Sequence, residues 1–289
     1  MTTKLIITTY LLLGTIAAMA QQVVVADNNT KEPLPYATIV FSQERKGIYA
    51  DNSGKFTVPL QYNATDSVNI SILGYHTKYT LVINLHDTVY LEQKAYELPT
   101  VTILPKDKNI IKLGNIKSKR NGYFGMSATF TPVVIASYIS NTHYENCYIE
   151  KLYFKYLHQK DGFSYLVRPQ LFEVGGNGEP AAPLLSKSTT LILPEKGGIL
   201  EIDVSNEFIV FPENGLFVGM EIIEPVNVYN KKNVKEELKR LIPIVINNKK
   251  RTTSWVSWLN DIQWINFASG FDGVGYFDFP FGLSIVCDK

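Results

Sequence analysis

The sequence predicts an all-β protein made of two β-sandwiches joined by a linker. Short runs of β-branched and aromatic residues recur along the chain, and Gly, Pro, Asn and Asp separate them. Regular short strands with turn residues between them are typical of antiparallel sandwiches and jelly rolls, and they argue against alternating β–α units. A polar stretch with Pro and Gly, residues 104–122, divides this pattern into two halves. The length of 289 residues suits one or two domains of about 100–200 residues each.

Residues 1–20 have the pattern of a cleavable export signal. Lys4 precedes an apolar run, residues 5–16, and a small-x-small cleavage site ends at Ala20. The run is shorter than the roughly 20 apolar residues that a spanning helix needs, and no later stretch approaches that length. We therefore expect a mature chain that begins at Gln21, has no transmembrane segment, and is periplasmic, outer-membrane-associated or secreted.

Residues 22–103 carry the strand and turn signals of the first sandwich. Residues 47–58 indicate a strand, a tight turn and a second strand, because Asn and Gly suit the turn and apolar residues alternate onto one face. Residues 66–75 repeat this pattern with a strand that ends at a glycine. Alternation places Phe56 and Ile72 in the core of this domain.

These two segments, together with a proline-flanked run at residues 30–41 and a closing stretch at residues 98–103, resemble a known module. It is the carboxypeptidase-regulatory-like, transthyretin-type β-sandwich that is abundant in Bacteroidetes surface proteins. The module is an accessory to other activities, so the resemblance implies a non-catalytic companion domain and an envelope location. It implies no peptidase activity, because a zinc carboxypeptidase needs a His-x-x-Glu pair. None of the four histidines is followed by Glu at that spacing.

Residues 123–289 predict the second, jelly-roll-like antiparallel sandwich. The expected strands are residues 149–157, 166–174, 199–204, 216–223 and 281–286. One helix is expected at residues 233–241, where apolar residues recur at helical spacing before Pro243 ends it. This half resembles the domain that often follows the regulatory module in uncharacterised Bacteroidetes proteins. The resemblance rests on residues 170–174, 177–180, 200–205 and 211–221, and it implies no activity.

The sequence predicts no catalytic, cofactor-binding or metal-binding residues. Residues 125–129 lack the closing glycine of a nucleophile elbow. The glycine-rich residues 174–178 are followed by Glu-Pro, where a phosphate-binding loop would have a lysine and a helix. The net charge of +1 gives no concentrated basic face for nucleic acid. We therefore expect a protein that is not an enzyme, with an unrecognised hydrolase as an alternative.

The two cysteines, Cys147 and Cys287, lie near the first and last strands of the second half. Such strands often neighbour each other in sandwiches, and an oxidising compartment permits a disulfide between them. The alternative is that each cysteine is a separate, buried, small apolar residue. The sequence leaves both interpretations open.

The most suggestive binding residues are aromatic. Trp255, Trp258 and Trp264 lie close together in the chain, and the spacing of the first two places them on opposite faces of a flat strand. An exposed tryptophan can stack on the apolar face of a sugar ring. Asn260 and Gln263 lie nearby and suit sugar hydroxyls. The alternative is that all three tryptophans fill the β core.

Ser67 and Thr88 are candidate O-glycosylation sites. Each follows an Asp and precedes a valine, the pattern of periplasmic O-glycosylation in Bacteroidetes. Ordinary entry from a turn into a strand explains the same strings.

The sequence thus predicts a non-catalytic, exported envelope accessory protein without cofactors. Its first expected role is a protein-interaction or assembly module at the outer membrane or cell surface. Its second is a glycan-binding protein that uses the aromatic residues of the second sandwich. Nothing in the sequence identifies the protein or glycan partner.

Overall fold

The computed structural model describes most of the two predicted domains. The described residues are 21–41, 46–95, 109–117, 122–124, 133–156, 165–194, 196–225, 244–248, 253–258, 263–266 and 277–287. The expected signal segment, residues 1–20, and the expected helix, residues 233–241, lie outside them. The described part is nearly all β, with two 3₁₀ turns and no α-helix. None of its helices is long and apolar enough to cross a membrane.

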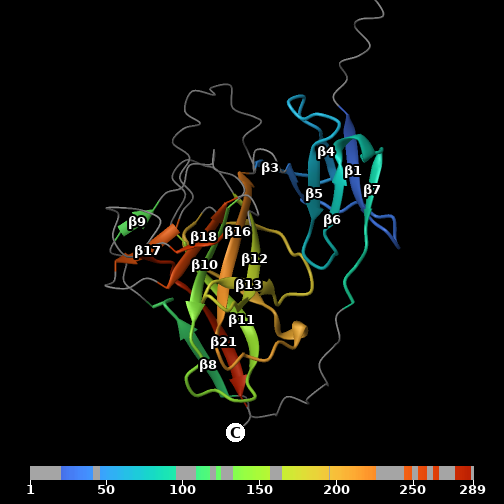
Figure 1. Ribbon diagram of the computed structural model, residues 1–289. Helices are drawn as coiled ribbons and strands as arrows, with labels where there is room; N and C mark the ends of the chain where they lie inside the picture. The colour runs from blue at the N-terminus through green and yellow to red at the C-terminus, as the bar shows by residue number, and fades with distance from the viewer. Residues whose placement is uncertain are drawn as a thin grey trace, which may run out of the picture.

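The first module is a sandwich of a three-stranded and a four-stranded sheet (Figure 1), in the orders β4-β1-β7 and β3-β2-β5-β6. Its elements are β1 (Gln22–Asp27), β2 (Thr38–Phe41), β3 (Lys46–Tyr49), β4 (Lys55–Thr57), β5 (Ser67–Ser71), β6 (Lys78–Leu81), η2 (Val82–Asn84) and β7 (Thr88–Leu91). β1 pairs in parallel with β7, and the other pairs are antiparallel. One apolar core joins the two sheets.

The predicted turn and core residues of this module are confirmed. Phe56 and Ile72 are 4% and 9% exposed. Gly54, in the turn before β4, has a φ of 71°, a value that glycine adopts without strain. A Cβ at Gly54 would lie 2.8 Å from the carbonyl oxygen of Val25. The glycine therefore lets the turn pack directly against β1.

The second module is a larger antiparallel sandwich of two seven-stranded sheets. Its elements are β8 (Asn109–Gly114), β9 (Gly122–Phe124), β10 (Val133–Ile139), β11 (Tyr148–Tyr156), β12 (Tyr165–Val174), β13 (Pro180–Pro183), β14 (Leu191–Leu193), β15 (Gly198–Asp203), η3 (Ser205–Glu207), β16 (Leu216–Pro225), β17 (Ile244–Asn248), β18 (Ser254–Trp258), β19 (Ile265–Asn266), β20 (Phe277–Asp278) and β21 (Phe281–Cys287).

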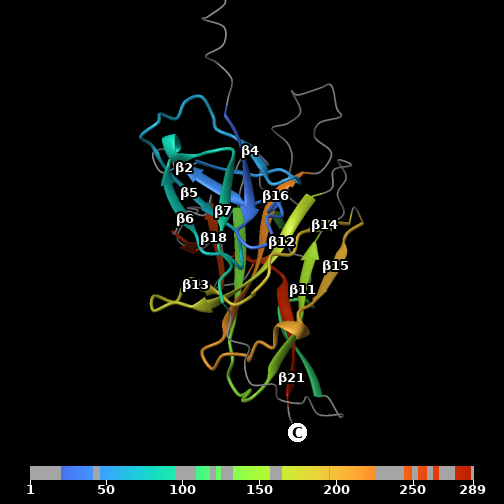
Figure 2. The ribbon, with the colours of Figure 1, turned by 90° about the vertical axis from the view of Figure 1, so that its right-hand side faces the viewer.

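One of these sheets has the order β13-β12-β16-β10-β18-β19, with β14 beside β12. The other has the order β20-β17-β11-β21-β8, with β15 beside β11 and β9 beside β17. Side chains from both sheets form a single core. Seen from the side of the first module, the strands of that module lie in front of β12, β16 and β18 (Figure 2). We call the sheet that contains these three strands the module-facing sheet.

The predicted linker, residues 104–122, is wrong over residues 109–114. These residues form β8, which pairs with β21 from Gly282 opposite Gly114 to Cys287 opposite Asn109. Ile111 and Leu113 pack against the core, while Ile110 and Lys112 are exposed. The polar residues around this segment led to the linker prediction, although the alternate residues Ile111 and Leu113 suit one face of an edge strand.

Candidate functional site

The outer face of the module-facing sheet is the candidate functional site. Side chains alternate between the two faces of a strand. Val218, Met220 and Val256 belong to the core between the two sheets. Their neighbours Phe217, Gly219 and Trp255 therefore lie on the outer face.

Aromatic side chains gather on this outer face. Phe217 is buried, and the half-buried rings of Tyr138 and Trp255 lie against it, with centroids 5.4 and 6.4 Å away. Phe172 and Trp264, both half-buried, meet edge to face at 5.2 Å and 73°. Each such pair contributes about 0.5–1.5 kcal/mol beyond its buried area. We call these five residues the aromatic surface.

Gly219 makes room for this arrangement. It pairs with Ala136 on β10, which also has a small side chain, and with Gln170 on β12. A Cβ at Gly219 would lie 3.0 Å from Cε2 of Phe172. The absence of a side chain therefore allows the Phe172 ring to lie over the sheet, where Trp264 packs against it.

Three of the five predicted glycan-binding residues fall in the described part of this site. Trp255 and Trp264 are both half-buried on the aromatic surface, and Gln263 is exposed beside Trp264. Trp258 ends β18 opposite Val133, but its side chain lies outside the described residues. Asn260 also lies outside them.

Sequence reasoning missed Tyr138, Phe172 and Phe217. These residues come from three different strands, and only the register brings them to the tryptophans. The local signal was weak, because a single aromatic residue in a strand is more often part of a core. Knowledge that Val218 and Leu171 face inward would have placed Phe217 and Phe172 on the outer face.

The same outer face carries a buried ion pair between Arg168 on β12 and Glu221 on β16. Arg168 Nη1 lies 3.0 Å from Glu221 Oε2, and the two side chains are 2% and 3% exposed. Gln170 Nε2 donates a second hydrogen bond to Glu221 Oε2 at 2.9 Å. Such pairs are stable only when further hydrogen bonds satisfy both charges.

The first module supplies one further hydrogen bond to each side chain of the pair, while Arg168 Nε stays buried without a hydrogen-bond partner among the described residues. The hydroxyl of Tyr49 donates to Glu221 Oε1 at 2.9 Å. Arg168 Nη2 donates to the carbonyl oxygen of Tyr36 at 2.8 Å. The two modules are thus joined by hydrogen bonds to a desolvated ion pair, and we call these four residues the inter-module lock.

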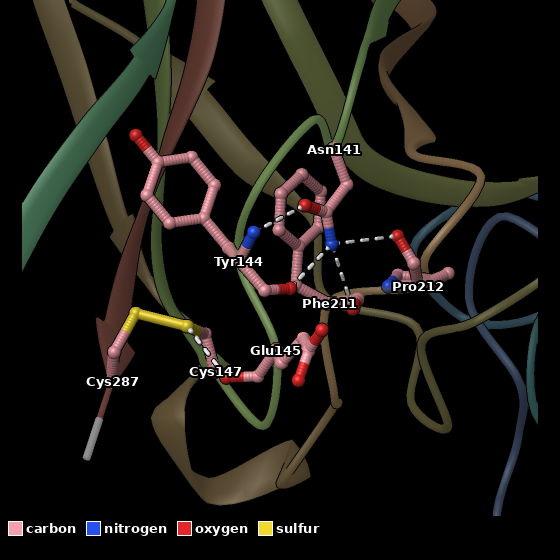
Figure 3. The surroundings of a disulfide bond; sticks show 7 residues. All are labelled: Asn141, Tyr144, Glu145, Cys147, Phe211, Pro212 and Cys287. Carbon is pink, nitrogen blue, oxygen red and sulfur yellow. Dashed lines mark hydrogen bonds between the residues drawn. A yellow bond between two sulfur atoms is a disulfide. The ribbon is translucent and has the colours of Figure 1, made fainter.

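Cys147 and Cys287 are joined by a disulfide, with 2.07 Å between the sulfur atoms and 4.2 Å between the α-carbons (Figure 3). The bond connects the residue before β11 with the last residue of β21, two strands that pair directly. Asn141 holds the preceding loop. Its side chain donates to the carbonyl oxygens of Tyr144 and Pro212, at 2.7 and 3.1 Å.

The two candidate glycosylation residues differ in exposure. Ser67 is exposed at the start of β5, and Thr88 is half-buried at the start of β7. Asp66, which precedes Ser67, is buried and accepts a hydrogen bond from the backbone N–H of Asn63 at 2.7 Å. This carboxylate therefore has a structural role in the turn that leads into β5.

Among the described residues, no group of three or more His, Cys, Asp or Glu side chains is placed to hold a metal ion. The acidic residues that the second module buries, Glu221 and Asp278, are both hydrogen-bonded. Asp278 Oδ1 accepts from the backbone N–H and the hydroxyl of Thr253, at 2.6 and 2.9 Å. These bonds hold β20 against the start of β18.

Comparison with known proteins gives a family match for part of the chain and distant structural likeness to solved proteins. No curated protein matches the chain. A solved structure that resembles it contains the cysteine protease and lectin-like domains of Cwp84, a surface layer associated protein of Clostridium difficile. The identity is 9% and the TM-score 0.37, and the match covers 84% of this chain and 46% of that one.

The present chain thus spans less than half the length of that structure. Residues 23–103 match the family model of the CarboxypepD_reg-like domain. This range contains all the strands of the first sandwich except the first residue of β1. The first module of this chain is therefore a member of the CarboxypepD_reg-like domain family.

Proposed function

We propose that the chain is an exported, non-catalytic accessory protein of the cell envelope that docks a protein partner through its first module. The observation that carries the proposal is a row of exposed apolar side chains on β6 and the turn after it. Tyr79, Leu81 and Ile83 are 73%, 37% and 63% exposed. We call these three residues the edge row.

The position of β6 suits recognition of an extended segment. β6 stands at the end of the order β3-β2-β5-β6, and none of the described strands pairs with it on the side away from β5. An edge strand presents backbone N–H and C=O groups that can pair with a strand from another chain. Tyr79 and Leu81 lie opposite Asn69 and Ser67, so they share one face and can supply anchors for the partner's side chains.

Two further observations support an accessory role at the envelope. The first module belongs to the CarboxypepD_reg-like domain family, and the inter-module lock fixes it on the second sandwich. The Cys147–Cys287 disulfide supports export, because disulfides form and persist in oxidising compartments.

Site-specific photo-cross-linking in the source cells tests this proposal. A photoreactive residue at position 79 or 83 should cross-link one discrete envelope protein, and the same residue at position 60 should not. Leu60 is the matched control, because it is an equally exposed apolar residue, at 78%, outside the edge row. An excess of protein without the photoreactive residue should compete for the partner and reduce the cross-linking. The same competitor carrying Tyr79→Ser and Ile83→Ser should not reduce it. Equal cross-linking from positions 60 and 79 would contradict the proposal.

Glycan binding by the aromatic surface is the second candidate function. The observation that favours it is that Trp255 and Trp264 are both half-exposed on one face of a rigid sheet, with the exposed amide of Gln263 nearby. Flat aromatic faces beside amide groups suit the apolar and hydroxyl-bearing faces of a sugar ring. A glycan array probed with the mature protein and with Trp264→Ala tests this candidate.

A further inference from the structure

A cavity of about 590 Å³ lies between the two modules. The first module contributes Tyr75, Gln93 and Lys94 to its wall, and the second contributes Lys187, Ser188 and Thr190 from the segment between β13 and β14. Small-molecule sites usually have volumes of about 300–1,000 Å³. The cavity therefore has the size of a ligand pocket, and we call it the inter-module pocket.

The wall from the first module is held by hydrogen bonds. Tyr75 pairs with Gln93 in an isolated β-bridge, and the backbone N–H of Lys94 donates to the carbonyl oxygen of Gly74 at 2.8 Å. The Tyr75 hydroxyl and Gln93 Nε2 both donate to Asp27 Oδ2, at 2.8 and 2.5 Å. These bonds fix the side chains of Tyr75 and Gln93 and the backbone of Lys94.

Asp27 does not line the pocket, and its carboxylate accepts hydrogen bonds from the wall residues Tyr75 and Gln93. The backbone N–H of Thr30 and the Tyr75 hydroxyl are the main donors that hold the pKa of Asp27 far below its ordinary range. Burial and the hydrogen bond to Asp27 raise the pKa of Tyr75. The phenol therefore stays protonated, and its hydroxyl proton points to Asp27.

The two walls approach each other at Gly74. A Cβ on this residue would lie 2.6 Å from the carbonyl oxygen of Ser186, and its φ of 91° also disfavours a side chain. The backbone N–H of Ser186 donates to Glu207 Oε2 at 2.8 Å, so the segment opposite Gly74 is also held. The pocket is thus bounded by two fixed walls.

The chemistry of the lining is cationic and rich in hydroxyl groups. Over the residues that the structure describes, it includes Lys94 and Lys187 and no Asp or Glu. Hydroxyl groups come from Ser186, Ser188 and Thr190, and the apolar residues Leu34, Pro35, Ile72 and Leu73 complete the lining with the ring of Tyr75. Two ammonium groups favour an anion. Hydroxyls beside an aromatic ring favour a sugar.

We infer that the inter-module pocket binds an acidic saccharide, with a carboxylate near Lys94 and Lys187 and sugar hydroxyls facing the serines and threonine. This site shares no residue with the edge row or the aromatic surface, so it goes beyond the proposed function. A protein partner on β6 and a saccharide in the pocket can be tested separately on the same chain.

Calorimetric titration of the full mature protein with trigalacturonate tests the inference. Maltotriose serves as the neutral saccharide and sodium sulfate as the anion without sugar. We expect binding of trigalacturonate at about 50 mM salt that weakens as salt is raised, because exposed charges are screened. Maltotriose and sulfate should each bind at least about tenfold more weakly, because each lacks one of the two interactions.

Variants of the lysines locate the site. Lys94→Gln and Lys187→Gln should each weaken trigalacturonate binding about five- to tenfold. Lys55→Gln is the matched control, because Lys55 is an exposed lysine on β4 outside the pocket. Tyr79→Ser, which tests the docking proposal, should leave saccharide binding unchanged. No binding, equal binding of sulfate, or unchanged binding after both lysine substitutions would overturn the inference.

Discussion

Removal of one partner from the inter-module lock should strongly destabilise the protein. Arg168→Met leaves Glu221 buried at 3% exposure, with hydrogen bonds from Gln170 and Tyr49 but without its counter-ion. The carbonyl oxygen of Tyr36 also loses its donor. Breaking a buried ion pair in this way costs about 3–5 kcal/mol. We therefore expect the free energy of unfolding to fall by that amount.

The double variant Arg168→Met with Glu221→Met separates charge burial from inter-module bonding. Replacement of both charges by apolar groups of similar size is often neutral or even stabilising. Tyr49 and Gln170 would still lose their acceptor, at about 1–3 kcal/mol for each unsatisfied group that stays buried. The double variant should consequently recover part, but not all, of the stability lost by Arg168→Met.

Chemical denaturation followed by circular dichroism and tryptophan fluorescence measures both effects. Lys151→Met is the matched control, because Lys151 pairs with Glu201 at 3.7 Å with side chains that are 38% and 48% exposed. An exposed pair of this kind contributes about 0–1 kcal/mol. If Arg168→Met is no more destabilising than Lys151→Met, the ion pair does not stabilise the protein as a buried pair would.

Three further predictions concern the disulfide, the aromatic surface and the acid limit of stability. Replacement of Cys147 and Cys287 by Ala should lower the free energy of unfolding by about 2–5 kcal/mol, because the disulfide closes a loop of 140 positions. An unchanged midpoint of chemical denaturation would contradict this prediction. Trp264→Ala should reduce glycan affinity by about 1–3 kcal/mol with little change in melting temperature if this ring binds sugar. Trp255→Ala should also destabilise the protein, because its ring packs on the buried ring of Phe217. Hydrogen bonds lower the pKa of Asp27 in the folded state. The stabilisation by its ionised carboxylate is therefore complete above the ordinary pKa of 3.8 and is lost as the pH falls below that value. In chemical denaturation across that range, the free energy of unfolding of Asp27→Asn should depend less on pH than that of the unchanged protein.

Local patterns were sufficient to predict the fold class. Alternation and turn chemistry identified the strands around Phe56 and Ile72 because both signals lie within a few residues of each other. β8 was missed for the opposite reason. Its pairing partner β21 lies at the other end of the module, and the short apolar run of β8 stands between polar stretches that are typical of a linker.

The functional surfaces depended even more on tertiary register. Trp255 and Trp264 could be identified because they are close in sequence. Arg168 and Glu221 are 53 positions apart, and no local rule pairs a charge in one strand with a charge in another. The inter-module pocket requires, in addition, the relative placement of two domains, which strand patterns do not encode.

The disulfide has a consequence for the proposed export of the chain. A chain exported from its N-terminus would bring Cys147 across the membrane 140 positions before Cys287. During that interval its thiol stands alone, since these are the only cysteines in the sequence. A wrong pairing within one molecule is therefore impossible, and an incorrect disulfide can form only with another molecule. Chains truncated before Cys287 would carry Cys147 as a single thiol and should form disulfide-linked dimers, which non-reducing electrophoresis would detect.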